Sequence, residues 1–143
     1  MSSHQPPPPA FAHLVNLADD LTGTFILWAN DDFFAPKENL LKPGPPEWKE
    51  GEYTDKGKWM DGWESQRRRE PGHDTCLVRL GTPGAITGIL ADTTHFKGNA
   101  PQEVSLEVLE AEHTATAAQL DARTDWVEVL PRTAVKPDFA NAL

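Results

Sequence analysis

The sequence contains a single cysteine, Cys76, so an internal disulfide bond is excluded. Such sparing use of cysteine is typical of a reducing compartment. No run reaches the roughly 18 apolar residues of a membrane span, and the N-terminus lacks the basic and apolar regions of a secretory signal. We therefore expect a cytoplasmic protein with no membrane partner. Cys76 lies in an apolar run and is expected to pack as a small hydrophobic side chain rather than to act as a nucleophile.

Basic residues are also scarce. Lys and Arg number 13 against 22 Asp and Glu, which gives a net charge of −9 and a pI of about 4.9. Non-specific binding to nucleic acid needs a basic surface, and so does docking on an anionic membrane; this charge balance argues against both. The Walker A, GxGxxG, CxxC, HExxH and GxSxG motifs are absent from the sequence. Nucleotide-phosphate cradles and the common hydrolase nucleophile therefore have no support.

The composition is sufficient for one globular domain. The 143 residues are 38% hydrophobic and 24% charged, which favours a folded chain over a disordered one. Residues 1–10 (MSSHQPPPPA) are an exception, because four consecutive prolines favour an extended polyproline conformation. We expect a disordered, Pro-rich leader over residues 1–10 and one domain over residues 11–143.

Short β-rich segments recur along this domain without alternating helices, which predicts an all-β antiparallel sandwich or jelly roll. The predicted strands are residues 11–18 (an edge strand), 23–29, 75–80, 85–92, 104–108 and 126–130. The tight turn at 81–84 predicts a hairpin of the third and fourth strands, and Pro131 is expected to close the last strand. Between and after the strands we expect an irregular loop at 36–55, a weak helical turn at most at 111–124, and no regular element at 132–143.

The most unusual stretch is residues 57–74 (GKWMDGWESQRRREPGHD). It places three consecutive arginines (67–69) beside Trp59 and Trp63, in a chain that is otherwise poor in basic residues. Planar guanidinium groups bind carboxylate or phosphate through two parallel N–H donors. Two interpretations stay open at this point: one wall of a binding site for a small anion, and a solvated basic turn.

Other polar residues also have two interpretations each. Glu64 precedes two of the arginines by three and four residues and could pair with them, which would only staple the loop. His73 and Asp74 could form an acid–base pair or serve the structure. Asp92 and His95 follow a predicted strand, where loops often carry function, and could form an acid–base or metal pair; the alternative is a surface histidine.

Several segments, taken together, resemble the allantoicase (allantoate amidinohydrolase) family. They are residues 16–18 (NLA), 27–43 (LWANDDFFAPKENLLKP), 53–74 (YTDKGKWMDGWESQRRREPGHD), 79–101 (RLGTPGAITGILADTTHFKGNAP) and 126–132 (WVEVLPR). The resemblance implies hydrolysis of allantoate to ureidoglycolate and urea, in allantoin and purine degradation, by a jelly-roll β-sandwich of the galactose-binding, discoidin-like type. Chains of the family carry two such repeats, and this chain resembles the first without its closing strands. That implies a homo-oligomer or association with a second repeat, because an incomplete sandwich leaves open edges.

The resemblance supplies the reaction, and the residue roles follow from the chemistry of the substrate. Allantoate carries a carboxylate and two ureido groups on one carbon, so it needs a cation, amide hydrogen bonds, and an acid or base for the departing urea. The candidates for binding the carboxylate are Arg67 and Arg68, and those for the rest of the substrate are Asn30, Asn99 and Trp63. Glu64 or His95 could be the general base or acid. Asp31 and Asp92 could orient that base or hold a divalent metal. No spacing forces a metal site, so no cofactor is assigned.

Two alternatives to an active enzyme stay open. A β-sandwich with the same loops could be a non-catalytic module that binds a ligand or a partner protein. A truncated homologue of the enzyme could also be inactive alone.

Overall fold

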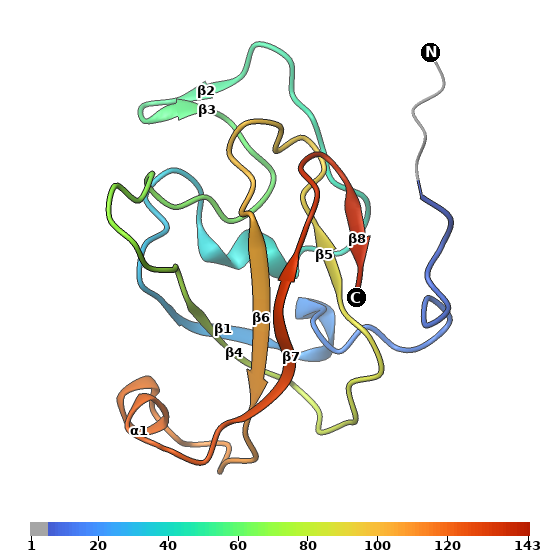
Figure 1. Cartoon of the computed structure of the whole chain (residues 1–143), viewed down its shortest axis with the longest axis vertical. Helices are drawn as coiled ribbons and strands as arrows, with labels where there is room; N and C mark the ends of the chain where they lie inside the picture. The colour runs from blue at the N-terminus through green and yellow to red at the C-terminus, as the bar shows by residue number, and fades with distance from the viewer. Residues whose placement is uncertain (1–5) are drawn as a thin grey trace. The chain divides into compact units, whose positions relative to one another are not determined.

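The protein is built almost wholly of short strands and loops (Figure 1), as described by a computed structural model over residues 6–143. The elements, in chain order, are the 3₁₀ helix η1 (Asp20–Thr22), β1 (Phe25–Ala29), the 3₁₀ helix η2 (Lys37–Leu41), β2 (Tyr53–Thr54), β3 (Gly57–Lys58), β4 (Cys76–Arg79), β5 (Leu90–Asp92), β6 (Glu103–Val108), α1 (Ala117–Asp121), β7 (Val127–Ala134) and β8 (Ala140–Ala142). The expected all-β class is confirmed. The predicted leader falls partly on residues 1–5, which lie outside the described residues.

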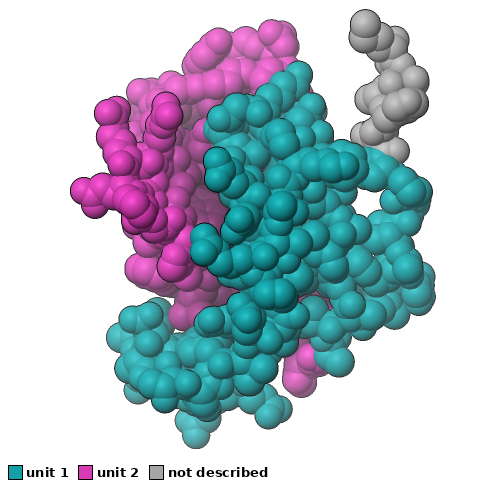
Figure 2. Space-filling view, in the orientation of Figure 1, with its two compact units in different colours: residues 1–15, 85–143 teal, residues 16–84 magenta. Residues whose placement is uncertain are grey.

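The chain divides into two compact units, which are coloured separately in Figure 2. Unit 1 comprises the described part of Met1–Val15 together with Ala85–Leu143, and unit 2 comprises Asn16–Gly84. Four two-stranded antiparallel sheets organise them, with β1–β4 and β2–β3 in unit 2 and β5–β8 and β6–β7 in unit 1.

Unit 2 is organised by the pairing of β1 with β4. The β1 sequence FILWA consists mainly of good strand formers, and Ile26 is its most deeply buried side chain at 1% exposed. At the start of β1 the buried Thr24 hydroxyl accepts a hydrogen bond from the Gly81 N–H at 3.0 Å. A side chain at position 81 would meet the Thr22 carbonyl oxygen at 2.1 Å, so only glycine allows this approach.

The long loop of unit 2 is more regular than expected. Residues 36–55 contain η2 and β2, and Leu41 at the end of η2 is buried together with Ala35 and Met60. The ammonium group of Lys58 donates to three backbone carbonyls around it, those of Lys49, Glu52 and Trp59, at 2.5–3.4 Å. Side-chain contacts to backbone carbonyls thus help to hold a loop that is rich in proline and glycine and has no long strand pairing.

In unit 1 the C-terminal residues form β8, which pairs with β5. The sequence pattern of residues 132–143 had predicted no element there. The buried Asn141 side chain donates to the carbonyls of Ala91, Lys136 and Phe139 at 3.1 Å each and accepts the Lys136 N–H at 2.9 Å. The pairing therefore depends on an asparagine that satisfies backbone groups, which hydrophobic periodicity does not detect.

The strand pair β6–β7 confirms the alternation predicted for residues 104–108, because Val104, Leu106 and Val108 are half-buried while their neighbours are exposed. The partner strand β7 was expected to end before Pro131, but it continues through this residue to Ala134. The register shifts between Val104 and Leu106, where one extra β7 residue is accommodated next to Pro131. A proline is compatible with a strand at such a bulge, because its missing N–H breaks no ladder bond.

Two further sequence-based expectations are wrong. Residues 75–80 and 85–92 do not form a hairpin: β4 pairs with β1, and β5 pairs with β8. Residues 11–18 form turns rather than an edge strand. The pairing partner of a strand is set by tertiary contacts that local sequence does not encode.

The weak helical turn expected within residues 111–124 is confirmed as α1. The Thr116 side chain accepts the Gln119 N–H, and the Gln119 side chain accepts the Thr116 N–H, which completes a capping box. The indole N–H of Trp126 donates to the Leu120 carbonyl at 3.1 Å and secures the C-terminal end of this helix to the start of β7.

Gly81→Ala is expected to destabilise the chain by about 1–3 kcal/mol, because the new methyl group overlaps the Thr22 carbonyl and forces β1 and β4 apart. Gly98→Ala is the matched control, since no atom lies within 4 Å of the added methyl group. Urea unfolding of both variants checks this. Equal midpoints for the two would contradict the close approach.

Candidate functional site

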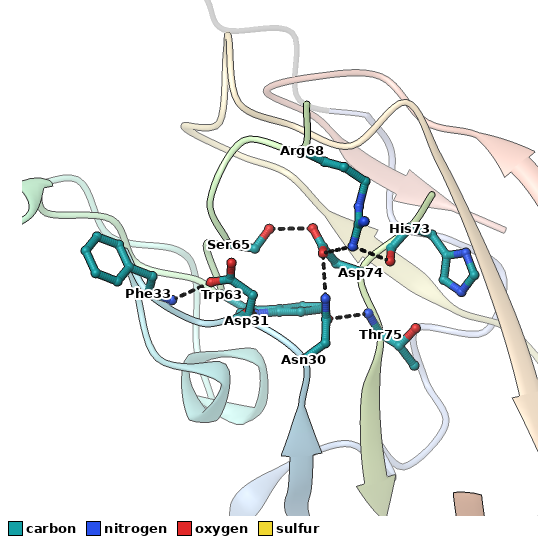
Figure 3. Close-up of polar contacts among 9 residues, drawn as sticks. All are labelled: Asn30, Asp31, Phe33, Trp63, Ser65, Arg68, His73, Asp74 and Thr75. Carbon is teal, nitrogen blue, oxygen red and sulfur yellow. Dashed lines mark hydrogen bonds and ion pairs between the residues drawn. The ribbon is translucent and has the colours of Figure 1, made fainter. Parts of the chain in front are cut away.

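The carboxylate of Asp74 lies at the centre of a polar cluster in unit 2 (Figure 3). One oxygen, Oδ1, accepts from the Asn30 amide at 2.8 Å and from the Arg68 guanidinium at 3.0 Å. The other, Oδ2, accepts from the Ser65 hydroxyl at 2.7 Å. One carboxylate thus links the chain after β1, the segment before the arginines, and the arginines themselves.

The strand pair β1–β4 positions this cluster. Immediately beyond the two strands the Asn30 N–H donates to the Thr75 carbonyl at 3.1 Å, and the Thr75 N–H donates to the Asn30 side-chain oxygen at 2.8 Å. The Asn30 amide oxygen therefore binds Thr75, the residue before β4, and its amide nitrogen binds Asp74. These contacts assign it a structural position, and its contact with a substrate stays a proposal.

Burial alone would raise the pKa of the Asp74 carboxyl. Hydrogen bonds from Asn30, Ser65 and Arg68, together with the charge of Arg68, outweigh that effect and hold the pKa below its ordinary value. The carboxylate is therefore ionised throughout the neutral range, which makes Asp74 a fixed negative charge rather than a proton carrier.

Three arginines line an open hollow of about 450 Å³ in unit 2. The Arg68 guanidinium binds residues that follow it closely in the chain: its Nη2 donates to the His73 carbonyl at 2.9 Å and to the Asp74 carboxylate at 3.0 Å. Arg67 and Arg69 are exposed and make no hydrogen bond or ion pair with any residue in the described part of the chain. The three consecutive guanidinium groups are therefore not equivalent.

Glu64 and Trp63 lie beside this segment, and their backbone positions are fixed. Glu64 and Ala35 form an antiparallel bridge in which each N–H donates to the other's carbonyl at 3.1 Å. The Trp63 indole donates to the Asp31 carbonyl at 2.7 Å, and the Asp31 carboxylate accepts the Phe33 N–H at 2.9 Å (Figure 3). Trp63 thereby joins the loop after β1 to the segment that precedes the arginines.

Trp59 has a different environment from Trp63. Two lysine ammonium groups lie over its ring, that of Lys49 at 4.2 Å and that of Lys42 at 5.6 Å from the ring centre. Lys42 also forms an ion pair with Asp61 at 3.1 Å, and the second Asp61 oxygen accepts the Glu47 N–H at 2.7 Å. These contacts stabilise the long loop, so Asp61 and Trp59 serve structure.

The remaining candidates, Asp92, His95 and Asn99, belong to unit 1. The Asp92 carboxylate caps its own turn by accepting the Thr94 N–H and hydroxyl at 2.9 and 2.5 Å. His95 has a positive φ of 73°, which is uncommon for a residue other than glycine, and its N–H donates to the Asp138 carboxylate at 2.8 Å. Asp138 itself has a φ of 48°. The Asp92 carboxylate is thus used within its own turn, whereas the backbone of His95 is held by the side chain of Asp138.

Sequence reasoning missed three residues of these clusters, Ser65, Asp138 and Asn141. Asp74 was weighed only together with His73, whereas its side-chain partners are Asn30, Ser65 and Arg68. Serine, asparagine and aspartate occur throughout the loops, so no local pattern marks the ones that bind backbone or charge from distant segments. Burial raises the pKa of the Cys76 thiol, which agrees with the packing role expected for it.

Within residues 6–143, no group of three or more His, Cys, Asp or Glu side chains is arranged to hold a metal ion. In the same part of the chain no helix is long and apolar enough to cross a bilayer.

The chain has the fold of an all-β sandwich protein whose loops carry the polar clusters. Over 90% of its length it is similar to a solved structure of allantoicase, with a TM-score of 0.71 and 24% sequence identity, and it covers 38% of that chain. It is also similar to the crystal structure of allantoicase from Saccharomyces cerevisiae, with a TM-score of 0.65 and 27% identity, covering 87% of this chain and 36% of the other.

A model of the allantoicase repeat matches residues 15–143, and the chain belongs to the allantoicase family. It is 49% identical over 122 residues to probable allantoicase 1 of Burkholderia mallei and 44% identical over 135 residues to a probable allantoicase of Nocardia farcinica. These matches cover 85% and 94% of this chain but 35% and 41% of the two relatives. The chain thus spans little more than a third of their length, which agrees with the single repeat expected from the sequence.

Asp74→Asn is expected to lower the free energy of unfolding at pH 7 by about 1–2 kcal/mol, because it removes the charge that three donors bind. The folded-state pKa of Asp74 is depressed, so its stabilisation is full above the unfolded pKa of about 3.9 and is lost as the pH falls through the lower folded value. The difference between wild type and variant should therefore narrow below about pH 4.

Urea unfolding between pH 7 and pH 2.5 measures this difference. Asp55→Asn is the control. It removes an equal charge, and Asp55 is exposed and has no bound partner among residues 6–143. A gap that stays constant down to pH 2.5 would contradict the role of the Asp74 charge.

Proposed function

We propose that this chain takes part in the hydrolysis of allantoate to ureidoglycolate and urea. Membership of the allantoicase family supports the reaction, and the arginines that line the hollow of unit 2 support an anionic substrate. The whole reaction of the longer relatives is a proposal for this chain, because it covers only 35–41% of their length.

The chemistry requires one carbon–nitrogen bond to break at the carbon that bears the carboxylate. The acid gives a proton to the departing urea nitrogen. The hydroxyl group of a water molecule takes the place of that nitrogen on the carbon, and the base takes the other proton of the water. An acid and a base, a cation for the carboxylate, and hydrogen bonds for the retained ureido group are sufficient for this sequence.

The chain offers side chains for each of these tasks. In unit 2, the arginine segment 67–69, which includes the predicted pair Arg67 and Arg68, is proposed to bind the carboxylate. Asn30 and Trp63 are proposed to bind the ureido groups, and Glu64 is proposed as the acid or base. In unit 1 the proposed groups are His95 as acid or base, Asp92 to orient it or hold a divalent metal, and Asn99 for a ureido group. Glu64 is the favoured carboxylate because the bridge with Ala35 fixes its backbone, and His95 because an imidazole has two nitrogens that can donate or accept a proton.

The proposed partner is a second repeat, either in another copy of this chain or in a separate polypeptide. The decisive assay incubates the purified chain with allantoate and measures urea release, first alone and then after addition of the second repeat of a two-repeat relative. Release by this chain alone supports a complete enzyme, and release only after the addition supports a site shared with the second repeat. Binding of allantoate without release under either condition would favour a non-catalytic module and contradict the proposal.

Glu64→Gln and His95→Ala are each expected to lower kcat by about 10²- to 10⁴-fold, with a smaller change in KM, because a general acid or base acts mainly in the transition state. The measurement uses whichever preparation releases urea. Glu110→Gln and His13→Ala are matched controls, since both residues are exposed and lie away from the candidates in sequence. Wild-type kcat in both test variants would exclude these two residues as the acid and base.

A further inference from the structure

The three arginines of residues 67–69 have the same chemistry but different surroundings, and this difference shows which of them can bind a ligand. All three line the same hollow. A guanidinium that is already bound to a carboxylate and a carbonyl has fewer donors and less net charge to offer an incoming anion than one without a partner.

Arg68 is turned back on its own segment. Its Nη2 contacts the Asp74 carboxylate at 3.0 Å and the His73 carbonyl at 2.9 Å. A methyl group added at Gly72 would lie 3.0 Å from the Arg68 Nη1 and 3.4 Å from its Cζ, so the guanidinium packs directly on the glycine backbone. The Arg68 side chain therefore closes the loop from residue 68 to residue 74.

Asp74 secures the other end of the same loop as well. Its second oxygen accepts from Ser65, which precedes the arginines, so residues 65, 68 and 74 are held by one carboxylate. Asn30 adds a donor from the segment after β1 and ties the loop to the sheet (Figure 3). The result is a short, braced loop on which the two flanking arginines are mounted.

Arg67 and Arg69 flank the bound arginine, and each keeps all its donors available. Both are exposed, and neither has a hydrogen bond or ion pair within residues 6–143. A single exposed arginine is ordinary on a protein surface. Here two of them line one hollow, on either side of an arginine that is paired with Asp74, so they form a local cationic pair.

We propose that Arg67 and Arg69 are the pair that binds the substrate carboxylate, and that Arg68 and Asp74 are positioning residues that brace the loop between them. This inference deepens the proposed function and rests on it for the identity of the ligand, an α-ureido carboxylate. It assigns Arg68, one of the two arginines expected from the sequence to bind the carboxylate, to the support of the site instead.

The test compares the binding of allantoate with that of its neutral carboxamide, which keeps both ureido groups and lacks the charge. Isothermal titration calorimetry on the full chain gives Kd for each ligand. Arg67→Gln and Arg69→Gln are each expected to raise Kd for allantoate by about 10- to 100-fold, since each removes a charge-assisted contact, and to leave Kd for the carboxamide within about twofold. Arg132→Gln is the matched control, because Arg132 is an exposed arginine that pairs with Glu103 in unit 1.

The positioning residues should behave differently. Arg68→Gln and Asp74→Asn are expected to weaken allantoate binding by about threefold to tenfold and to lower the unfolding midpoint, whereas Arg67→Gln and Arg69→Gln leave that midpoint unchanged. Asp74→Glu keeps the charge and should restore part of the preference for the charged ligand. A merely structural role for Asp74 would weaken both ligands equally.

Each outcome has a defined meaning. The assignment would be overturned if Arg68→Gln lost more of the preference for allantoate over its carboxamide than Arg67→Gln and Arg69→Gln do. It would also be overturned if the wild-type chain bound none of allantoate, ureidoglycolate and glycolate. A chain that binds these carboxylates through Arg67 and Arg69 but releases no urea, alone or with the second repeat, would contradict the proposed function and leave the anion site standing.

Discussion

A charged carboxylate that is three-quarters buried needs donors around it, and Asp74 obtains them from three separate segments. An ionised group loses its hydration on burial, and that cost is offset only when hydrogen bonds replace the lost water. Asn30 can supply one of those bonds only if the end of β1 lies beside the start of β4, which their register and the Asn30–Thr75 contacts ensure. The strand pairing, the carboxylate and the arginine loop therefore form one dependent arrangement.

The same arrangement resolves a conflict between stability and binding in the arginine segment. Three adjacent guanidinium groups repel one another, and a loop that carried all three unpaired would spread. One ion pair in the middle neutralises one of the three charges, which lowers that repulsion and leaves the flanking charges available. In a chain with a net charge of −9, such a local cationic site is also the place where an anion finds the least opposing field.

Sequence reasoning predicted the features that depend on local pattern. The all-β class followed from short β-rich segments, and strands β1, β4 and β6 lie where β-formers and alternation placed them. The family followed from long segments of shared residues. Strand partners could not be predicted, because β4 and β5 are adjacent in sequence yet pair with β1 and β8.

The candidate site shows the same division. The composition of residues 57–74 marked the arginine segment, since three arginines in an acidic chain are conspicuous in the sequence alone. The difference between Arg68 and its neighbours depends on Asp74 and Ser65 meeting across a loop, which is a property of the folded chain. His95 was recognised by type, but its positive φ and its contact with Asp138 depend on a turn more than forty residues further on.

The bulges of β7 have a consequence for how this strand can change in length. On β6, the inward-facing residues Val104, Leu106 and Val108 are two residues apart. Their β7 partners, Thr133, Leu130 and Val127, are three residues apart. Of these partners, Leu130 and Thr133 are half-buried and Val127 is exposed. Each bulge places one extra β7 residue opposite β6, so β7 residues that face the same side are three apart across a bulge instead of two. Deletion of one residue from either bulge would therefore give a regular pairing at that point, with the faces of the strand unchanged. Single-residue deletions at the two bulges should therefore be tolerated independently of each other.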